Sequence, residues 1–309
     1  MAWTTANIPD LTGQTAVVTG ANSGIGLVAA RELGRSGARV LLACRDLQRG
    51  QGALDHLTHQ TPQATYELVQ LDLADLSSVR DGAARIQERT GGVVDLLVNN
   101  AGVMAVPYRR TADDFEMQFG TNHLGHFALT GHLMTALLAA PAARVVTVSS
   151  TAHRFGRINF SNLNAERHYR KWPAYGQSKL ANLLFTLELD RRAREAGRSL
   201  QATAAHPGLA ATNLVAAGPL LNIHPRIAGA TERVSGVMTQ SAEQGALPTL
   251  RAATDPNVAG GDYLGPAGFM ETRGAPVWVS STAPAHDRAT AQKLWQVSEK
   301  LTQVGYPPF

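Results

Sequence analysis

The chain contains 309 residues, of which 44% are hydrophobic and 17% are charged, and this composition excludes an intrinsically disordered protein. The net charge of +4 is small for this length, and no dense cluster of Lys and Arg predicts a nucleic-acid-binding surface. The single cysteine, Cys44, excludes an intrachain disulfide and favours a reducing, cytoplasmic compartment. No apolar run of about 18 residues predicts a membrane span, and the N-terminal residues do not have the pattern of a signal peptide.

Strand-like apolar segments alternate with helical patterns along the chain. The predicted strands cover residues 15–19, 38–44, 66–71, 93–98, 144–149, 200–206 and 263–264. The predicted helices cover residues 27–34, 47–59, 79–89, 115–138, 175–196, 242–253 and 289–302. This alternation predicts an α/β fold, namely a Rossmann-type doubly wound parallel sheet with helices on both faces.

The chain contains no linker, internal repeat or low-complexity segment, so we expect one domain over residues 1–309. Residues 209–245 are expected to form a substrate lid, and residues 265–309 a C-terminal extension. The lid is apolar and carries few charges, which favours a lipophilic alcohol, aldehyde or ketone as substrate. Alternatively, its apolar residues pack among themselves or against a subunit. They are Leu209, Leu214, Val215, Leu220, Leu221, Ile223 and Met238.

A glycine-rich turn joins the first predicted strand to the first helix, with glycines at Gly20, Gly24 and Gly26. Glycine lets the backbone approach a pyrophosphate closely, and a helix N-terminus offers free N–H groups to the phosphates. The spacing departs from the commonest dinucleotide fingerprint. The turn predicts a nucleotide site, and the alternative is a tight turn with nothing bound.

The end of the second predicted strand indicates which nucleotide is bound. A carboxylate at this point would favour NAD by binding the ribose 2′-hydroxyl, but the chain has Cys44 followed by Arg45. Arg45 can pair with a 2′-phosphate, which favours NADP(H), although it could instead pair with Asp46 at the surface. Asp72, after the third strand, is placed to bind an adenine amino group.

Tyr175 and Lys179 stand four residues apart on a predicted helix, so their side chains lie on one face. A free Tyr has a pKa near ~10, and a nearby ammonium favours its phenolate. Lys179 and a cationic cofactor ring could together bring this pKa to about 7, where Tyr175 could transfer protons. The alternative is an ordinary amphipathic helix.

These motifs occur in an order and spacing that resemble the short-chain dehydrogenase/reductase family. The similarity covers most of residues 12–215, and its detail most resembles the retinol dehydrogenase and WW-domain oxidoreductase branch. Protochlorophyllide reductases are also similar in this region. The resemblance is carried by residues 19–26, Asp72–Leu73, residues 99–102, Asn122, Ser149–Ser150, Tyr175, Lys179, Pro207–Gly208 and Thr212.

The resemblance implies catalytic roles. Tyr175 would be the general acid/base, Lys179 would lower its pKa and hold the ribose hydroxyls, and Ser150 would hold the substrate oxygen. Asn122 would anchor a water in a proton relay through Lys179. The 25-residue separation of Ser150 and Tyr175 reflects an insert that the branch shares. Ser149 is the alternative to Ser150, because adjacent strand residues face opposite sides.

The matched motifs, with Arg45, also imply a cofactor site. Asn99, Ala101 and Gly102 would pack beside the adenosine half of the cofactor. The nicotinamide, its carboxamide or the diphosphate would be contacted by Pro207, Gly208 and Thr212. The whole expected set is Gly20, Asn22, Ser23, Gly24, Ile25, Gly26, Arg45, Asp72, Leu73, Asn99, Ala101, Gly102, Tyr175, Lys179, Pro207, Gly208 and Thr212.

The function predicted from these features is NADP(H)-dependent hydride transfer between nicotinamide and a small lipophilic carbonyl or alcohol. Two alternatives are reduction of a carbon–carbon double bond and a non-catalytic NADP-sensing interaction protein. No metal site is expected, because His123 and His126 lack neighbouring Asp, Glu or Cys at ligand spacing. A homodimer or homotetramer through helices 115–138 and 175–196 is expected from the resemblance, and the C-terminal extension could block or build that interface.

Overall fold

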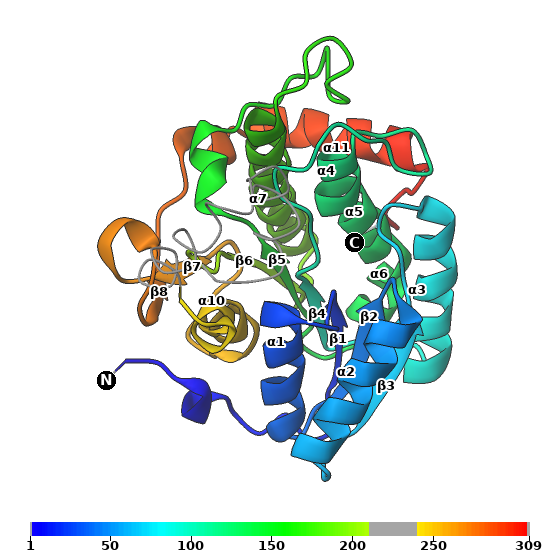
Figure 1. Ribbon diagram of the computed structural model, residues 1–309, viewed down its shortest axis with the longest axis vertical. Helices are drawn as coiled ribbons and strands as arrows, with labels where there is room; N and C mark the ends of the chain where they lie inside the picture. The colour runs from blue at the N-terminus through cyan, green and yellow to red at the C-terminus, as the bar shows by residue number, and fades with distance from the viewer. Residues whose placement is uncertain (1, 210–239, 308–309) are drawn as a thin grey trace, which may run out of the picture.

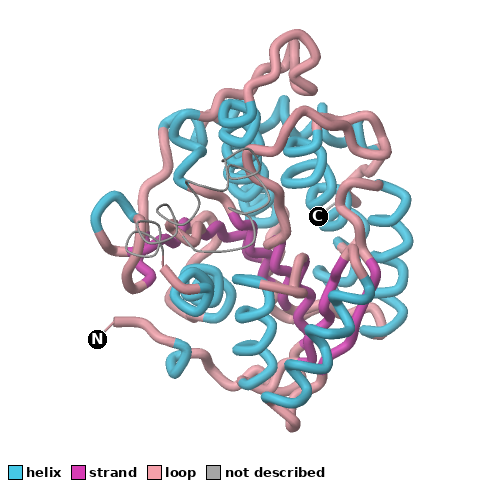
Figure 2. Tube along the Cα trace, in the orientation of Figure 1, coloured by secondary structure: helices cyan, strands magenta, loops and turns pink. Residues whose placement is uncertain are grey.

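The computed structural model describes residues 2–209 and 240–307 (Figures 1 and 2), and these residues contain an eight-stranded sheet. The strand order is β3–β2–β1–β4–β5–β6–β7–β8, and all neighbours are parallel except β7 and β8. The strands are β1 (Thr15–Thr19), β2 (Arg39–Cys44), β3 (Tyr66–Gln70), β4 (Leu96–Asn99), β5 (Arg144–Val148), β6 (Gln201–Ala205), β7 (Tyr263–Pro266) and β8 (Pro276–Trp278).

Helices cover both faces of this sheet, which confirms the predicted fold class. The α-helices are α1 (Gly24–Arg35), α2 (Leu47–Gln60), α3 (Leu76–Thr90), α4 (Met117–Phe119), α5 (Gly125–His132), α6 (Met134–Ala139), α7 (Lys171–Glu195), α10 (Ala242–Thr254) and α11 (Arg288–Thr302). The shorter helical turns are η1 (Thr5–Asn7), the π-helical η2 (Gly120–Leu124), η3 (Thr151–Phe155), η4 (Phe269–Glu271) and η5 (Ala283–His286). Figure 1 shows α1, α2 and α10 on one face and α3, α5 and α7 on the other.

The central strands are buried on both faces, which explains their nearly continuous apolar sequence. Val17 and Leu41 face the core beneath α3, α5 and α7, whereas their neighbours Val18 and Leu42 face the core beneath α1, α2 and α10. The carboxyl ends of the parallel strands therefore meet along one edge, where the loops that follow β1, β4, β5 and β6 come together.

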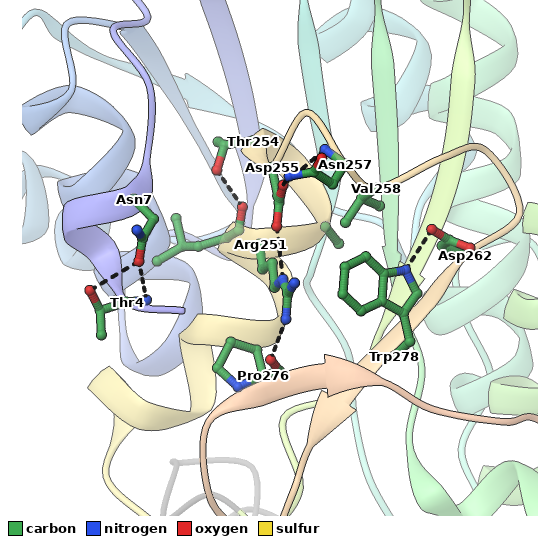
Figure 3. Close-up of polar contacts among 12 residues, drawn as sticks. Thr4, Asn7, Arg251, Thr254, Asp255, Asn257, Val258, Asp262, Pro276 and Trp278 are labelled. Atoms are coloured by element: carbon green, nitrogen blue, oxygen red, sulfur yellow. Dashed lines mark hydrogen bonds and ion pairs between the residues drawn. The ribbon is translucent and has the colours of Figure 1, made fainter. Parts of the chain in front are cut away.

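The antiparallel strand β8 was missed by the sequence prediction, because three residues carry too little periodicity. Side chains from other elements hold it in place (Figure 3). Arg251 of α10 donates to Asp255 at 2.9 Å and to the carbonyl oxygen of Pro276 at 2.6 Å, and it stacks on the Trp278 ring at 4.1 Å. Trp278 in turn donates its indole N–H to Asp262. These contacts hold β8 against α10 and against the residue that precedes β7.

Helix α11 packs across α5 and α7 through an aromatic cluster. Trp295 stacks against Phe185 of α7, with ring centroids 5.8 Å apart, and meets Phe127 of α5 edge-on at 5.2 Å. Tyr306 packs on Trp295 and donates its hydroxyl to the carbonyl oxygen of Phe127. The C-terminal residues therefore cover the outer surface of the two helices on which a dimer or tetramer was expected.

Several helices differ in their bounds from the sequence prediction, and α1 and α3 each begin three residues earlier. Helix α7 begins at Lys171 rather than at Tyr175, because Pro173 lies in the first turn, where a helix tolerates proline. The predicted helix over 115–138 is divided among α4, η2, α5 and α6. Most of the expected lid, residues 209–245, lies outside the described residues, as does Thr212. None of the helices within 2–209 and 240–307 is long and apolar enough to cross a membrane.

Candidate active site

The glycine turn after β1, residues 20–26, is closely packed, and we call it the glycine cradle. Gly20 has a positive φ of 66°, which favours glycine, and a Cβ on Gly26 would lie 2.4 Å from the carbonyl oxygen of Gly20. Ser23 is the N-cap of α1, but its side chain makes no capping hydrogen bond. The first N–H groups of α1 are therefore uncapped by a side chain and point into the cradle. This arrangement fits a pyrophosphate.

The end of β2 lies beside the cradle. Cys44 is buried, and its desolvation raises the pKa of the thiol to about 11, so it stays neutral. Arg45 follows it and is exposed, and among residues 2–209 and 240–307 it forms no ion pair. Asp46 does not pair with Arg45, because its carboxylate caps α2 by accepting from the backbone N–H of Arg49. A guanidinium is therefore left at the position expected for a 2′-phosphate.

Residues after β4 form the opposite wall of the cradle. Asn100 donates its side-chain amide to the carbonyl oxygen of Thr19, and the Thr19 hydroxyl accepts from the backbone N–H of Asn100 and Ala101. Asn100 was not assigned by the sequence analysis, although it lies within a matched motif. By contrast, the side chain of Asn99 is fully buried and donates to Thr130 on α5. Only the backbone of Asn99 can face a cofactor.

The side chains of Asp72 and Leu73, after β3, are mainly structural. Leu73 is buried in the core beneath α3 and α5. One oxygen of Asp72 accepts from the backbone N–H of Ala74, which leaves the other oxygen available. The prediction that Asp72 binds adenine is compatible with this geometry, whereas Leu73 can contribute only through its backbone.

Asn122 lies in the π-helical turn η2 and is fully buried. Its side chain accepts from the backbone N–H of Val103 and donates to the carbonyl oxygen of Val103 and to the Ser178 hydroxyl. Both polar atoms of the side chain are therefore used in structural contacts. The backbone carbonyl oxygen accepts from His126 at 3.0 Å and keeps a second lone pair, with which it could hold a water.

Ser149 and Ser150 after β5 have different environments. Ser149 is buried and donates to the carbonyl oxygen of Lys179 at 2.8 Å. Ser150 is partly exposed, is the N-cap of η3 and lies within hydrogen-bonding reach of the Tyr175 hydroxyl. The geometry therefore favours Ser150 over Ser149 as the residue that could hold a substrate oxygen.

Tyr175 and Lys179 lie on the face of α7 that meets the strand ends. They are 4% and 3% exposed, and the Lys179 Nζ lies 5.7 Å from the centre of the Tyr175 ring. Nζ donates to the carbonyl oxygen of Val148 at 2.9 Å, which anchors it at the end of β5. A Cβ on Gly102 would lie 3.6 Å from Nζ and 3.0 Å from Asn122 Oδ1, so the loops after β4 and β5 meet α7 here.

Burial dominates the electrostatics of this pair. It raises the pKa of Tyr175 to about 12, although the hydrogen bond with Ser150 partly offsets this effect. It also lowers the pKa of Lys179 to about 8. Desolvation therefore sets the direction of the Tyr175 pKa shift in the protein without cofactor, whereas the predicted lowering combines Lys179 with a cationic cofactor ring.

The loop after β6 closes the site. Gly208 has a positive φ of 64°, and a Cβ there would lie 2.4 Å from the carbonyl oxygen of Thr272. The backbone N–H of Gly208 donates to Nδ1 of His206, and that of Leu209 donates to the same Thr272 carbonyl oxygen. Pro207 and Gly208 are thus held against the β7–β8 connection.

A family model described as short chain dehydrogenase matches residues 14–218, which include every site segment described above. The chain belongs to the short-chain dehydrogenase family. Its similarity to retinol dehydrogenases places it in the retinol dehydrogenase-like branch of this family of oxidoreductases. Mouse retinol dehydrogenase 12 is 40% identical over 301 residues, which cover 96% of this chain and 88% of that protein. Human retinol dehydrogenase 13 is 40% identical over 307 residues, covering 98% and 87%.

Solved structures share the dehydrogenase fold. An uncharacterised protein of Mycobacterium paratuberculosis is 44% identical, with a TM-score of 0.81 over 99% of this chain and 100% of that one. A structure from Beutenbergia cavernae, described as an NAD(P)-dependent gluconate 5-dehydrogenase with bound NADP, is 27% identical. Its TM-score is 0.63 over 82% of this chain and 95% of that one.

Proposed function

We propose that this chain is an NADP(H)-dependent dehydrogenase that transfers hydride between nicotinamide and a lipophilic carbonyl or alcohol. The observation that carries the proposal is the convergence of Ser150, Tyr175 and Lys179 at the carboxyl ends of the strands, beside the glycine cradle. Ligands of open α/β sheets bind outside these strand ends. A proton donor and a candidate nucleotide site therefore lie at the same edge of the sheet.

The preference for NADP(H) rests on the end of β2. Arg45 forms no ion pair within the described part of the chain, and no carboxylate stands at the position of Cys44 to bind a ribose hydroxyl or to repel a phosphate. A guanidinium pairs well with a phosphate through two parallel N–H donors. The NADP in the Beutenbergia cavernae structure supports the same assignment.

The bound nicotinamide would supply or accept the hydride, and the residues of this chain would supply the proton and fix the reacting oxygen. The substrate oxygen would accept hydrogen bonds from Ser150 and Tyr175. Tyr175, with a pKa raised to about 12, is protonated at neutral pH and can donate its proton to a developing alkoxide. Lys179, held by the Val148 carbonyl oxygen, would stabilise the phenolate left behind.

In the protein without cofactor, burial keeps Tyr175 protonated at neutral pH, which is the state that carbonyl reduction requires. The retinol dehydrogenases that this chain resembles are named for a lipophilic alcohol, and this supports a lipophilic substrate class. A cytoplasmic location belongs to the proposal through the single reduced cysteine, Cys44.

The proposal is tested by titrating the purified protein with NADPH and NADH and following nucleotide fluorescence. We expect tighter binding of NADPH, and we expect Arg45→Ala to weaken NADPH by about 10-fold or more while leaving NADH nearly unchanged, because one charge-assisted contact is lost. Glu166→Gln, an exposed change remote from the cradle, is the control. Tighter binding of NADH would overturn the cofactor assignment.

The substrate class is tested in the same preparation with a panel of carbonyl compounds and NADPH. Lipophilic aldehydes and ketones should be reduced to alcohols. Turnover restricted to small sugars or hydroxy acids would contradict the lipophilic class. Reduction of an enone to a saturated ketone, rather than to an allylic alcohol, would show that the carbon–carbon double bond is the target.

A further inference from the structure

The β7–β8 connection contains two consecutive residues in an unusual backbone conformation. Met270 and Glu271 have φ values of 51° and 56°, in the left-handed region that favours glycine. Glycine adopts this backbone conformation at a lower energetic cost than Met or Glu does. Glu271 therefore stands at a position where its backbone conformation is unfavourable, and such positions are typical of functional sites.

This conformation brings the Glu271 carboxylate between two segments of the candidate active site. One oxygen lies 2.7 Å from the guanidinium of Arg154, in the η3 turn that begins directly after Ser150. The other lies 3.0 Å from Nε2 of His206, the residue before Pro207. The carboxylate thus joins the loop after β5 to the loop after β6.

The proton position on His206 follows from its other contact. Nδ1 accepts from the backbone N–H of Gly208 at 3.2 Å, so the ring proton lies on Nε2 and faces Glu271. The two atoms are close but poorly aligned for a directional hydrogen bond, so the attraction is mainly electrostatic. His206 is fully buried, and the contact therefore acts in a medium that screens it weakly.

Backbone contacts extend this link to the next residues. The carbonyl oxygen of Thr272 accepts from the backbone N–H of Leu209 at 2.9 Å. The same oxygen would lie 2.4 Å from a Cβ on Gly208, so no side chain fits there. The backbone N–H of Gly274 donates to the side chain of Gln240, which also donates to the carbonyl oxygen of Pro207. The loop after β6 is therefore hydrogen-bonded to the β7–β8 connection, directly and through Gln240.

We infer that Glu271 is a positioning residue that holds the Pro207–Gly208 loop, and with it the nicotinamide half of the cofactor, in register with Ser150. The inference rests on the proposed function for the identity of the cofactor. His206 and Arg154 hold the pKa of the Glu271 carboxyl below its ordinary value, so it is ionised at neutral pH. Arg251 contacts Pro276 and Trp278 of β8, directly after the connection, and so helps to hold in place the segment that carries the Glu271 carboxylate.

Glu271→Gln tests this role, because it keeps the shape of the side chain and removes its charge. Glu67→Gln is the matched control. The Glu67 side chain is 27% exposed, against 22% for Glu271. It contacts two basic side chains, Arg39 and Arg89, as Glu271 contacts Arg154 and His206. Glu67 lies near the amino end of β3, away from the carboxyl ends of the strands where the site lies, so the control loses a similar pair of contacts outside the site.

The first readout is hydrogen exchange of the backbone amides of Gly208 and Leu209, followed by mass spectrometry. We expect Glu271→Gln to speed their exchange by about 10-fold, because a charged contact that holds the segment is lost, and Glu67→Gln to leave it unchanged. Unchanged exchange in Glu271→Gln would overturn the inference. This readout needs neither cofactor nor substrate, so it separates failure of the inference from failure of the proposed function.

The second readout compares two ligands, NADPH and adenosine 2′,5′-bisphosphate, which lacks the nicotinamide half. Glu271→Gln should weaken NADPH by about 10-fold and leave the bisphosphate unchanged, because only the nicotinamide end is displaced. Equal weakening of both would indicate general destabilisation and would contradict a positioning role. Wild-type protein that binds neither ligand would refute the proposed function instead. If Glu271→Gln fails to fold, Glu271→Asp, which keeps the charge but shortens its reach, takes its place with a smaller expected effect in the same direction.

Discussion

At the residue scale, the pKa values of Tyr175 and Lys179 are moved in opposite directions by one cause. Burial disfavours the charged form of each group, so the phenol becomes a weaker acid and the ammonium a stronger one. The two pKa values move apart, from the ordinary 10.0 for Tyr175 and 10.5 for Lys179 to about 12 and about 8. The pair is therefore set to keep a proton on Tyr175 and to lose one from Lys179 as the pH rises.

This ordering predicts a pH dependence for carbonyl reduction. Lys179 carries its charge below its lowered pKa of about 8 and loses it above, while Tyr175 stays protonated up to about 12. We expect kcat/KM for reduction to be level below pH ~7 and to fall as the pH passes about 8. A pH–rate profile between about pH 6 and 10 measures this.

Lys179→Met is the control for the pH profile. It should lower the rate at all pH values by about 100-fold or more and remove the fall near pH 8, because the titrating group is gone. If the fall persists in Lys179→Met, another group is responsible. If the wild-type profile is level up to about pH 10, the proposed contribution of the Lys179 charge is wrong.

Several side-chain roles could be predicted from the sequence and others could not. The pairing of Tyr175 with Lys179 follows from their spacing on one helix. The choice between Ser149 and Ser150 could not be made from alternation alone, because it depends on which hydroxyl lies near the Tyr175 hydroxyl and which donates to the Lys179 carbonyl oxygen. The buried environment of Asn99 depends on Thr130, which is 31 residues away. Such long-range contacts leave no periodic signal in the sequence.

At the element scale, the βα turn at Gly20–Gly26 depends on the absence of side chains. A Cβ on Gly26 would lie 2.4 Å from the carbonyl oxygen of Gly20 and 2.5 Å from the Asn100 amide. We expect Gly26→Ala to displace the turn and to weaken NADPH by about 10-fold or more, since overpacking of this kind costs about 1–3 kcal/mol. Fluorescence titration measures the affinity.

Gly52→Ala, in the middle of α2, is the matched control for Gly26→Ala. A Cβ there meets nothing within 4 Å, so alanine should leave NADPH binding unchanged and stabilise the protein by about 0.5–1 kcal/mol. Equal NADPH affinity in Gly26→Ala and Gly52→Ala would show that the cradle does not approach the cofactor.

Strand β8 and the π-helical turn η2 show where element prediction from sequence fails. The seven parallel strands were all predicted, and the apolar runs of the central strands β1 and β2 reflect burial on both faces. β8 has three residues, and its position depends on Arg251 and Trp278 rather than on its own pattern. The π turn changes the helical phase by one residue within an apolar stretch, and a pattern of period 3.6 does not detect this.

At the scale of the whole molecule, α11 covers the outer side of α5 and α7. Buried residues occur on every side of α7 between Ala174 and Ala193, because the sheet covers one side and the C-terminal residues another. An assembly that pairs α5 and α7 with those of a second copy would require α11 to leave. We therefore predict that any dimer or tetramer of this chain uses another surface.

Trp295 is the residue on which this covering depends most. It is buried against Phe127, Phe185 and Tyr306, and Arg192 stacks on its indole at 4.3 Å. Trp295→Ala should lower the free energy of unfolding by about 3–5 kcal/mol, because it leaves a large cavity. Chemical denaturation measures this change, and a loss below about 1 kcal/mol would show that α11 contributes little to the fold.

Leu47→Ala is the control for Trp295→Ala. Leu47 is an exposed apolar residue on α2, and its replacement should change stability by about 0.5 kcal/mol or less. Sedimentation analysis of Trp295→Ala adds the second readout. If loosening α11 frees the α5–α7 surface, this variant should self-associate more than the wild type.

The most direct test of the account compares NADPH binding and carbonyl turnover in Tyr175→Phe. The hydroxyl is the proposed proton donor, and its loss should lower turnover by about 100-fold to 10,000-fold. NADPH affinity should stay within about 3-fold of the wild type, because the cradle at Gly20–Gly26 and Arg45 are untouched. Lost turnover with retained NADPH binding is the result predicted here, and retained turnover would contradict the assignment of Tyr175 as the general acid.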